Sequence, residues 1–343
     1  MPDPAGAPVQ PCAVIVPARN AERTLEACLG SIDSQMERPL RRIVVDDGSS
    51  DGTASIARRL GWEVVSRQGP ATGPMEARYA GVLAATECPV LVFVDADVIL
   101  PPGGLALLCA PVLDGRADAV TGLLEGGHRT GTWWGDFKNE YMEHVFRSRP
   151  EEVDFLYGSA FAVRASELDV FEPIRGPFGS LVADSELGLR LAARGRKVRL
   201  EHRLLLKHLK PYGPLGLLRN DYVIPFLFAR MCLRYRARGA ARGAFSHASV
   251  LQLAATLSVP AAVWGALWGP GPALAWLVFA VTMLTVCWGA FLARLTTRRG
   301  AGFAVSAAFW LVPDACAMTL GMFSGALWEI VWRIGGGRPG NAA

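Results

Sequence analysis

Pairs of aspartates follow two of the short apolar runs in the first hundred residues. Asp46 and Asp47 come directly after one run, and Asp95 and Asp97, separated by Ala96, come directly after another. Because ligands of parallel sheets bind beyond the carboxyl ends of the strands, we expect both pairs to face one site. Carboxylates at such an edge suit a ligand that carries hydroxyls, N–H groups and metal-bound phosphates.

The segment Asp95–Ala96–Asp97 is typical of a divalent-metal site. In an extended segment, residues i and i+2 point the same way, so the two carboxylates would repel each other unless a cation joined them. Mg²⁺ and Mn²⁺ prefer oxygen ligands and commonly share them with substrate phosphates. A solvated turn is the alternative for this segment, and Asp46 and Asp47 also fit an ordinary turn that leads into a helix.

Two further candidates come later in the sequence. Asp184 lies near the start of a predicted helix at residues 183–190, where it is either a helix N-cap or a functional carboxylate. His208 ends another apolar run, and a lone histidine at such a place is more often structural than a ligand.

The elements that must position these side chains follow from the alternation of patterns before residue 211. Short apolar or β-branched runs alternate with helical stretches, which predicts βαβ units and a mostly parallel sheet. The predicted strands are residues 13–16, 43–45, 63–65 and 90–94, and the predicted helices are residues 21–34, 53–60 and 74–85.

The remainder of the chain predicts a membrane region. Hydrophobic residues make up 51% of the sequence and charged residues 19%, which is too apolar for an ordinary soluble domain. Residues 248–293 contain no charged side chain, and one bilayer span takes about 20 residues. We predict transmembrane helices at 248–268, 273–293 and 302–332. Pro313 and Asp314 leave a hairpin open as the alternative to a single third span.

Arginines set the expected orientation. One group of arginines precedes the first predicted span and a second group follows the second span, so the positive-inside rule places the N-terminal domain in the cytoplasm of a multi-pass cell-membrane protein.

The first twelve residues lack the charged start and apolar run of a secretory signal. The seven scattered cysteines are typical of buried thiols in a reducing compartment. Residues 211–247 are expected to form an interfacial amphipathic and basic linker; a helix packed on the first domain is the alternative.

Taken together, the motifs resemble glycosyltransferase family 2, the inverting transferases with the GT-A fold. The resemblance covers roughly residues 10–210 and implies a Rossmann-like GT-A domain at residues 1–210, followed by the transmembrane helical region at 248–334. Its motifs are V-I-x-P-x-x-N at 14–20, V-D-D-G-S-x-D-x-T at 45–53, D-x-D at 95–97, the second to eighth positions of E-D-x-x-L-x-x-R at 184–190, and a histidine 24 positions after the aspartate of that last motif.

The resemblance also implies a role for each matching residue. Asp184 would be the catalytic base that takes the acceptor's proton. The donor would be a UDP- or GDP-sugar, and the cofactor Mg²⁺ or Mn²⁺. The residues implied to bind the nucleotide sugar are Pro17, Arg19, Asp46, Asp47, Arg78, Asp95 and Ala96, and those implied to hold the metal are Asp97, Asp95 and His208.

Some positions depart from the family pattern. Ala183 replaces the usual glutamate before the catalytic aspartate, Arg19 stands where an aromatic residue is common, and Tyr79 stands where asparagine is common. No Q-x-x-R-W motif follows His208, which disfavours a processive polysaccharide synthase. We therefore predict transfer of a single sugar to a membrane lipid or polyprenyl-phosphate acceptor at the cytosolic face of the bilayer, without a nucleic-acid partner. A processive synthase and a degenerate membrane scaffold, which Ala183 would favour, are the alternatives.

Overall fold

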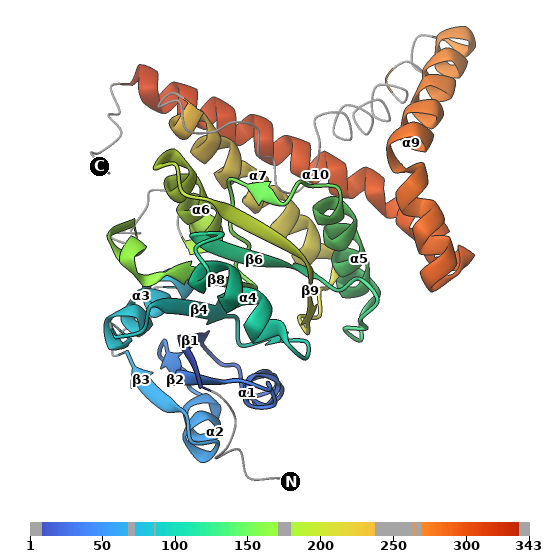
Figure 1. The fold of residues 1–343 in the computed structure, drawn as a ribbon. Helices are drawn as coiled ribbons and strands as arrows, with labels where there is room; N and C mark the ends of the chain where they lie inside the picture. Colours follow the sequence, from blue (N-terminus) through green and yellow to red (C-terminus); the bar gives the residue numbers. More distant parts are fainter. Residues whose placement is uncertain are drawn as a thin grey trace.

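A mixed sheet with helices on both faces forms the body of the protein (Figure 1). The computed structural model describes residues 9–67, 73–85, 87–170, 180–236, 264 and 269–335. The strands are β1 (Val9–Ala18), β2 (Arg38–Asp46), β3 (Glu63–Ser66), β4 (Val90–Val94), β5 (Val98–Ile99), β6 (Ala119–Leu124), β7 (Glu152–Val153), β8 (Ala160–Arg164) and β9 (Val198–His208). The helices are α1 (Leu25–Asp33), α2 (Thr53–Arg59), α3 (Pro74–Ala84), α4 (Gly104–Leu113), α5 (Trp133–Arg147), α6 (Ala183–Ala193), α7 (Pro214–Arg236), α9 (Pro270–Arg299) and α10 (Ala301–Ile334), with 3₁₀ turns at Ala165–Val170 and Ser180–Val182.

The strand order is β3-β2-β1-β4-β8-β6-β9-β5, and β7 pairs with β9. Strands β1 to β4 are parallel, whereas β8 is antiparallel to both of its neighbours. The four predicted strands are confirmed. The first predicted helix begins later than expected, at Leu25, because the backbone turns at Ala21, whose carbonyl accepts from the N–H groups of Thr24 and Leu25. The parallel half brings the ends of β1, β2 and β4 to one edge.

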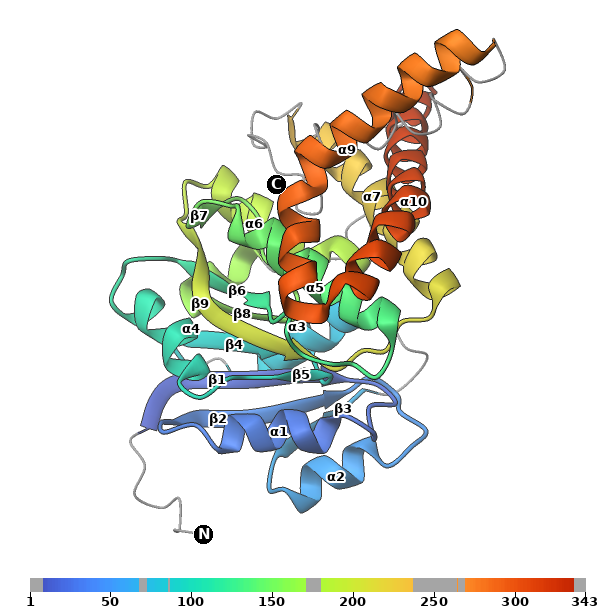
Figure 2. The same cartoon turned by 90° about the vertical axis from the view of Figure 1, so that its right-hand side faces the viewer.

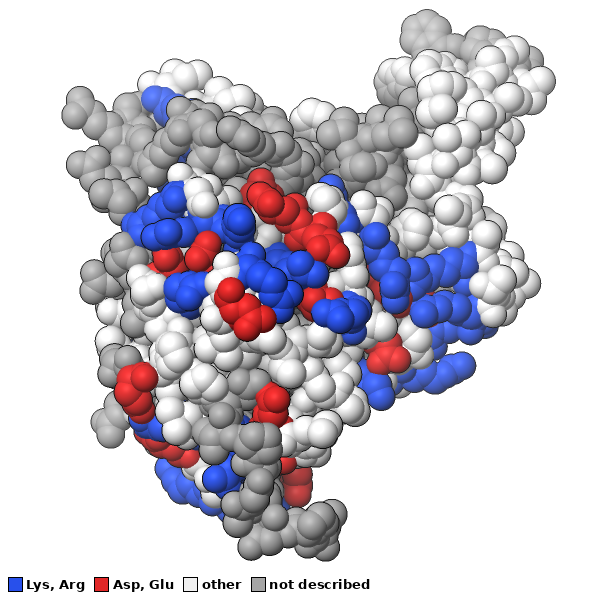
Figure 3. Space-filling view, in the orientation of Figure 1, with Lys and Arg blue, Asp and Glu red and all other residues white. Residues whose placement is uncertain are grey.

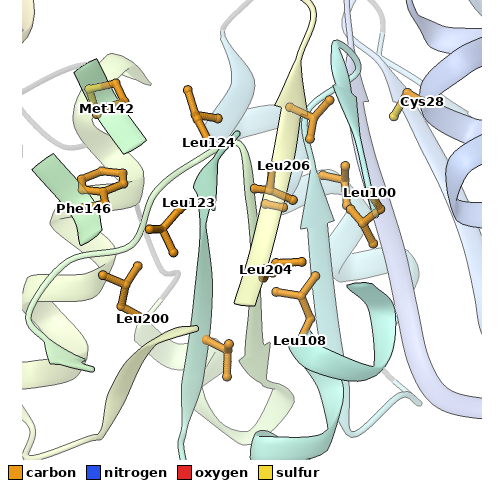
Figure 4. Close-up of a cluster of buried hydrophobic side chains, with 14 of the residues drawn as sticks. Cys28, Leu100, Leu108, Leu123, Leu124, Met142, Phe146, Leu200, Leu204 and Leu206 are labelled. Atoms are coloured by element: carbon orange, nitrogen blue, oxygen red, sulfur yellow. The ribbon is translucent and has the colours of Figure 1, made fainter. Parts of the chain in front are cut away.

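Burial on both faces explains why the strand sequences are apolar without alternation. All five residues of β4 are buried. Figure 4 shows part of the larger core, where Met142 and Phe146 of α5 lie over the leucines of β6 and β9. On the other face, α3 approaches β1 at Gly81: a Cβ atom there would lie 2.3 Å from Cγ2 of Ile15. Glycine at this position therefore permits close packing of α3, which carries Arg78.

The C-terminal helices α9 and α10 pack on the domain and share its core (Figure 2). The sequence left Trp133 and Trp134, at the start of α5, without an assignment. Both rings contact Trp310 of α10, with centroids 6.2 Å apart in each pair. Phe291 of α9 packs against Tyr141 of α5 in the same way. These aromatic contacts join the two parts of the chain.

A seam of glycines joins α10 to α7. A Cβ atom at Gly321 would lie 2.2 Å from the carbonyl oxygen of Tyr222, and one at Gly325 would lie 2.2 Å from that of Phe226. Glu329 of α10 is fully buried, and its carboxylate lies 2.6 Å from Nε of Arg234. Helix α7 thus packs against α10, and its Leu217 belongs to the core of the domain. The interfacial linker at residues 211–247 stays a prediction.

The predicted apolar spans correspond to helices where the structure describes them, whereas insertion in a membrane stays a prediction. Helix α10 runs through Pro313 without a break, so the hairpin alternative for residues 302–332 is wrong. It is the one described helix that is long and apolar enough to cross a bilayer by itself. Residues Ala273–Met283 and Thr285–Arg299 of α9 pass the same test as a pair bent by 51°. Apart from residue 264, the predicted span 248–268 lies outside the described residues.

The arginines at the end of α9 have partners within the domain. Arg299, with 4% of its side chain exposed, contacts Glu140 and Asp136 of α5 at 2.9 and 3.3 Å. Arg298 contacts Glu140 and Glu143, two fully buried carboxylates. These ion pairs attach α9 to the domain, a role that the positive-inside interpretation did not include.

Candidate active site

The loops after β1 and β2 hold each other in place at the edge of the sheet. Asn20, in a left-handed conformation with φ of 49°, donates its N–H to Ser49 Oγ and accepts from the Ser50 N–H. Asp46 ends β2 beside Ala18, and its Oδ1 accepts from the Ser49 N–H at 2.9 Å. The structure therefore presents the end of β2 in a fixed loop, with Asp46 only 8% exposed.

Asp47 has partners inside the protein. Its Oδ1 lies 2.5 Å from Arg67 Nη1, and its Oδ2 accepts from the Gly73 N–H at 3.1 Å. The carboxylate therefore connects β2 to the segment that leads into α3. On the other strand end, Pro17 is buried and Arg19 is exposed to solvent.

Arg78 is the buried cation of the site. Only 3% exposed, it donates through Nη2 to Asp95 Oδ1 at 2.6 Å and to the Gly158 carbonyl at 3.0 Å, and it lies over the Phe161 ring. Burial raises the pKa of Asp95, an effect that the Arg78 charge opposes and the Asp97 charge reinforces. The close ion pair orients Asp95 toward Arg78.

Asp97 lies beside His208. Their Oδ2 and Nε2 atoms are 3.5 Å apart, because β5 pairs with β9 in a register that places Val98 opposite His208. Burial alone would raise the pKa of Asp97, but the hydrogen bond and charge of His208, together with the Lys210 charge, hold it below its usual value. The buried Nδ1 of His208 has no hydrogen-bond partner among the described residues.

The expected geometry of the D-x-D segment is wrong in one respect. Residues 95–97 form a turn between β4 and β5 instead of an extended segment, and the Val98 N–H donates to the Asp95 carbonyl. The two carboxylates consequently differ in partners: Asp95 binds Arg78, and Asp97 faces His208. The cause is that β5 must reverse direction to pair antiparallel with β9.

Asp184 lies in the first turn of α6, which begins at Ala183. It is not the N-cap: that position is Val182, and no side chain caps the helix. Instead, Asp184 Oδ2 accepts from the Gly158 N–H at 2.5 Å. Glycine is needed at 158, since a Cβ atom there would lie 2.8 Å from Asp184 Oδ2 and 3.2 Å from Arg78 Nη2. Burial raises the pKa of Asp184, as expected for a carboxyl held away from water.

The structure thus gathers five predicted residues into one site and leaves the others at its border. Asp46 and Pro17 lie on β2 and β1 at the same edge, and Arg19 follows the end of β1. Ala96 lies in the turn, 8% exposed. Asp47 contacts the neighbouring loop. The gathered residues are Arg78, Asp95, Asp97, Asp184 and His208.

Sequence reasoning missed two tyrosines of the site. Burial raises the pKa of Tyr157, with further contributions from Tyr212, Asp184 and Asp95. Burial likewise raises the pKa of Tyr212, as do the Asp221 and Asp97 charges. Both rings therefore lie close to the carboxylates. Tyr212 could have been predicted from its position four residues after the candidate His208. No motif near residue 157 indicated a site.

The geometry fits a divalent ion that protein side chains and substrate phosphates coordinate together. No group of three or more His, Cys, Asp and Glu side chains that could hold an ion alone occurs in the described parts of the chain. Asp97 and His208 offer an oxygen and a nitrogen side by side, with Asp95 one turn residue away. Mg²⁺ and Mn²⁺ commonly complete their coordination with substrate phosphates, so two protein ligands are compatible with this chemistry.

Comparison with known proteins agrees with this arrangement of motifs. Residues 13–170 match the family model described as glycosyl transferase family 2. Residues 13–170, a little under half of the chain, are thus similar to family 2 glycosyltransferases. The domain's mixed, mostly parallel sheet is GT-A-like, as the sequence predicted.

Curated relatives match part of the chain. An uncharacterized glycosyltransferase from Mycobacterium tuberculosis (strain ATCC 25618 / H37Rv) is 42% identical over 109 residues, which are 32% of this chain and 46% of that protein. The 4,4'-diaponeurosporenoate glycosyltransferase of Staphylococcus aureus (strain USA300) is 42% identical over 89 residues, 25% of this chain and 23% of that protein. The chain therefore spans half or less of the length of these relatives.

A solved structure extends the likeness beyond the domain. The mannosyltransferase PcManGT from Pyrobaculum calidifontis, in complex with GDP-Man and Mn²⁺, has a TM-score of 0.52 and 19% identity. The alignment covers 96% of this chain and 89% of that chain. At this identity the likeness concerns the fold, and it includes the C-terminal helices because the GT-A-like part alone is far less than 96% of the chain.

Proposed function

We propose that this chain is an inverting, divalent-metal-dependent glycosyltransferase that moves one sugar from a UDP- or GDP-sugar to a lipid-type acceptor at a membrane face. The observation that carries the proposal is the juxtaposition of Asp97 with His208 beside the Arg78–Asp95 pair, with Asp184 and Arg78 both next to Gly158. The relatives named above are glycosyltransferases, and the PcManGT structure contains GDP-Man and Mn²⁺.

The donor would lie along the carboxyl edge of β1, β2 and β4. Asp46, with Pro17 and Arg19 beside it, would bind the nucleoside, and Arg78 would keep Asp95 oriented toward the ribose. Asp97 and His208 would hold Mg²⁺ or Mn²⁺, which supplies charge neutralisation for the leaving diphosphate. Asp47 supports this edge through its bonds to the neighbouring loop.

Asp184 would act on the acceptor side. Its raised pKa favours proton uptake, and the Gly158 N–H fixes its direction. If the attacking oxygen carries a proton, Asp184 takes it as the bond to the anomeric carbon forms. Attack opposite the leaving diphosphate inverts that carbon. Ala183 is fully buried in a core cluster, so the position before the base contributes packing in this protein.

Membrane association is part of the proposal. Apolar side chains are exposed along α9 and α10, and on the face in Figure 3 the projecting part of α9 carries no charged side chain. Large exposed apolar surfaces indicate contact with lipid or protein. We propose a multi-pass protein in the cell membrane with its transferase domain in the cytoplasm. The exposed apolar residues include Leu274, Leu277, Val278, Phe279, Val305, Phe309, Leu320, Phe323 and Leu327.

The direct test is turnover of a panel of UDP- and GDP-sugars by the purified full chain, with lipid extract as acceptor and with Mg²⁺, Mn²⁺ or EDTA. We expect turnover only with a divalent ion, and loss of all turnover in Asp97→Ala. Asp114→Ala is the matched control, because Asp114 is an exposed carboxylate far from the site in an ion pair with Arg116. Full activity of Asp97→Ala, or equal activity in EDTA, would refute the metal assignment.

A further inference from the structure

A cavity of about 360 Å³ opens next to the candidate active site. It lies between the 3₁₀ turn Ser180–Val182, the segment that follows β9, and the first half of α7. Its lining residues are Leu181, Lys210, Pro211, Tyr212, Gly213, Gly216, Arg219, Asn220, Val223 and Ile224. None of them was assigned a role by the sequence.

The cavity borders the reacting groups on two sides. Lys210 follows His208 by two residues, and its charge contributes to the low pKa of Asp97. Leu181 precedes Asp184 by three residues, at the entry to α6. Tyr212 lies in the wall, and the Asp97 charge is one of the causes that raise its pKa, so the wall is close to the candidate metal ligands. A molecule in this cavity would therefore have one end near the donor sugar.

The chemistry of the lining is cationic and apolar. Among the described residues that line it, the charged side chains are Lys210 and Arg219, and none is a carboxylate. Within the described residues, neither cation takes part in an ion pair; Lys210 lies over the Tyr212 ring at 5.1 Å. Most other arginines near the site are neutralised, as Arg67 and Arg78 are by aspartates. Two cations in the wall of one cavity favour an anionic ligand.

The other half of the cavity is apolar. Leu181 is 59% exposed at its border, and Val223 and Ile224 line it from one side of α7. Helix α7 continues from there toward α10 and its exposed apolar face. An uncharged sugar would leave the cations without partners, whereas free phosphate would leave the apolar side unused.

We propose that this cavity is the acceptor subsite and that it takes an amphiphile with a phosphate head, which Lys210 and Arg219 hold while the apolar chain lies against Leu181, Val223 and Ile224. The inference rests on the proposed function and adds the acceptor's chemical class. A phosphate oxygen forms the bond to the anomeric carbon, and the bond from that carbon to the donor diphosphate breaks, with the electron pair leaving on the nucleoside diphosphate. A phosphate monoester has a second pKa of about 6, so the attacking oxygen is already deprotonated at neutral pH and needs no base.

The test compares three probes on the full chain in non-ionic detergent: dodecyl phosphate, dodecanol and inorganic phosphate, each by calorimetric titration. We expect dodecyl phosphate to bind at least about tenfold more tightly than either of the others, since it alone uses both halves of the cavity. Lys210→Gln and Arg219→Gln should each weaken its binding by about tenfold, and the double variant by more.

Arg116→Gln is the matched control, because Arg116 is an exposed cation outside the cavity; we expect it to bind dodecyl phosphate like the unaltered protein. Equal binding of dodecanol and dodecyl phosphate, or unchanged binding in the double variant, would overturn the proposal. Inorganic phosphate binding as tightly as dodecyl phosphate would also overturn it, because the cavity would then recognise free phosphate.

Mn²⁺-dependent binding of UDP and GDP, measured on the same samples, separates this inference from the proposed function. Arg219→Gln should keep its nucleotide affinity within about threefold, which also shows that this variant is folded. Absence of nucleotide binding in the unaltered protein would reject the proposed function, whereas normal nucleotide binding with no preference for the phosphate-bearing probe would reject the acceptor subsite alone.

Discussion

Substitution of single glycines by alanine tests the close contact between α7 and α10. Gly321 and Gly325 face the backbone of α7, and a Cβ atom at either position would lie 2.2 Å from a carbonyl oxygen. At Gly302, in the same helix, a Cβ atom would meet nothing within 4 Å. The substitution Gly→Ala therefore has opposite consequences at different positions along one helix.

The magnitude follows from these distances. A carbon–oxygen contact across a helix interface settles at about 3.3 Å or more, so alanine at Gly325 would force the helices apart by about 1 Å. Overpacking of this kind costs about 1–3 kcal/mol. In contrast, glycine to alanine in an open helical position stabilises by about 0.5–1 kcal/mol. We expect Gly321→Ala and Gly325→Ala to lower the free energy of unfolding and Gly302→Ala to raise it.

Thermal unfolding of the purified chain in detergent measures the difference. At about 2–4 °C for each kcal/mol, the seam variants should melt several degrees below Gly302→Ala. Because Phe226 lies two residues beyond Ile224 on α7, Gly325→Ala should also weaken the binding of dodecyl phosphate. Equal melting temperatures for all three variants would refute the close α7–α10 contact and the reasoning built on it.

Three further results are expected. Arg299→Gln removes one of the two arginine partners of the buried Glu140 carboxylate, so it should destabilise the protein by about 1.5–3 kcal/mol in thermal unfolding, whereas Arg116→Gln, in an exposed pair, should change little. Burial, aided by the nearby Arg294 charge, lowers the pKa of His144 from its usual 6.5, so the unfolded chain takes up the proton first as the pH falls. Stability from this group is complete above pH 6.5 and is lost below it; in His144→Gln the melting temperature should fall less between pH 7 and pH 5, and an identical fall would contradict the assignment. Asp184→Asn should keep turnover within about tenfold for a phosphate-bearing acceptor, and a loss of about 10²–10⁴-fold would instead indicate a hydroxyl acceptor.

The elements of the first hundred residues were predictable because their signals are local. An uninterrupted apolar run such as β4 is what a strand buried on both faces requires, and the turn residues after it mark the edge where a ligand binds. The same reasoning located Asp46, Asp95 and Asp97. It misjudged the D-x-D geometry, since the turn at residues 95–97 depends on the pairing of β5 with β9, more than a hundred residues away.

The C-terminal helices show a different limit. Composition predicted apolar helices at 273–293 and 302–332, and α9 and α10 cover these ranges. It could not show that Trp310 packs on the tryptophans of α5, or that the arginines after the second span pair with buried glutamates. Hydropathy reports how apolar a segment is and carries no information about its partner.

The sequence by itself determined the first four strands with the helices between them, the aspartates at the strand ends and the apolar character of the tail, because each depends on neighbours within a few residues. Only the tertiary structure decided that Asp184 accepts from Gly158 near Arg78, that His208 faces Asp97, and that a cationic cavity lies beside them. These contacts join segments far apart in the chain. Their geometry comes from strand register and helix packing, which no local pattern encodes.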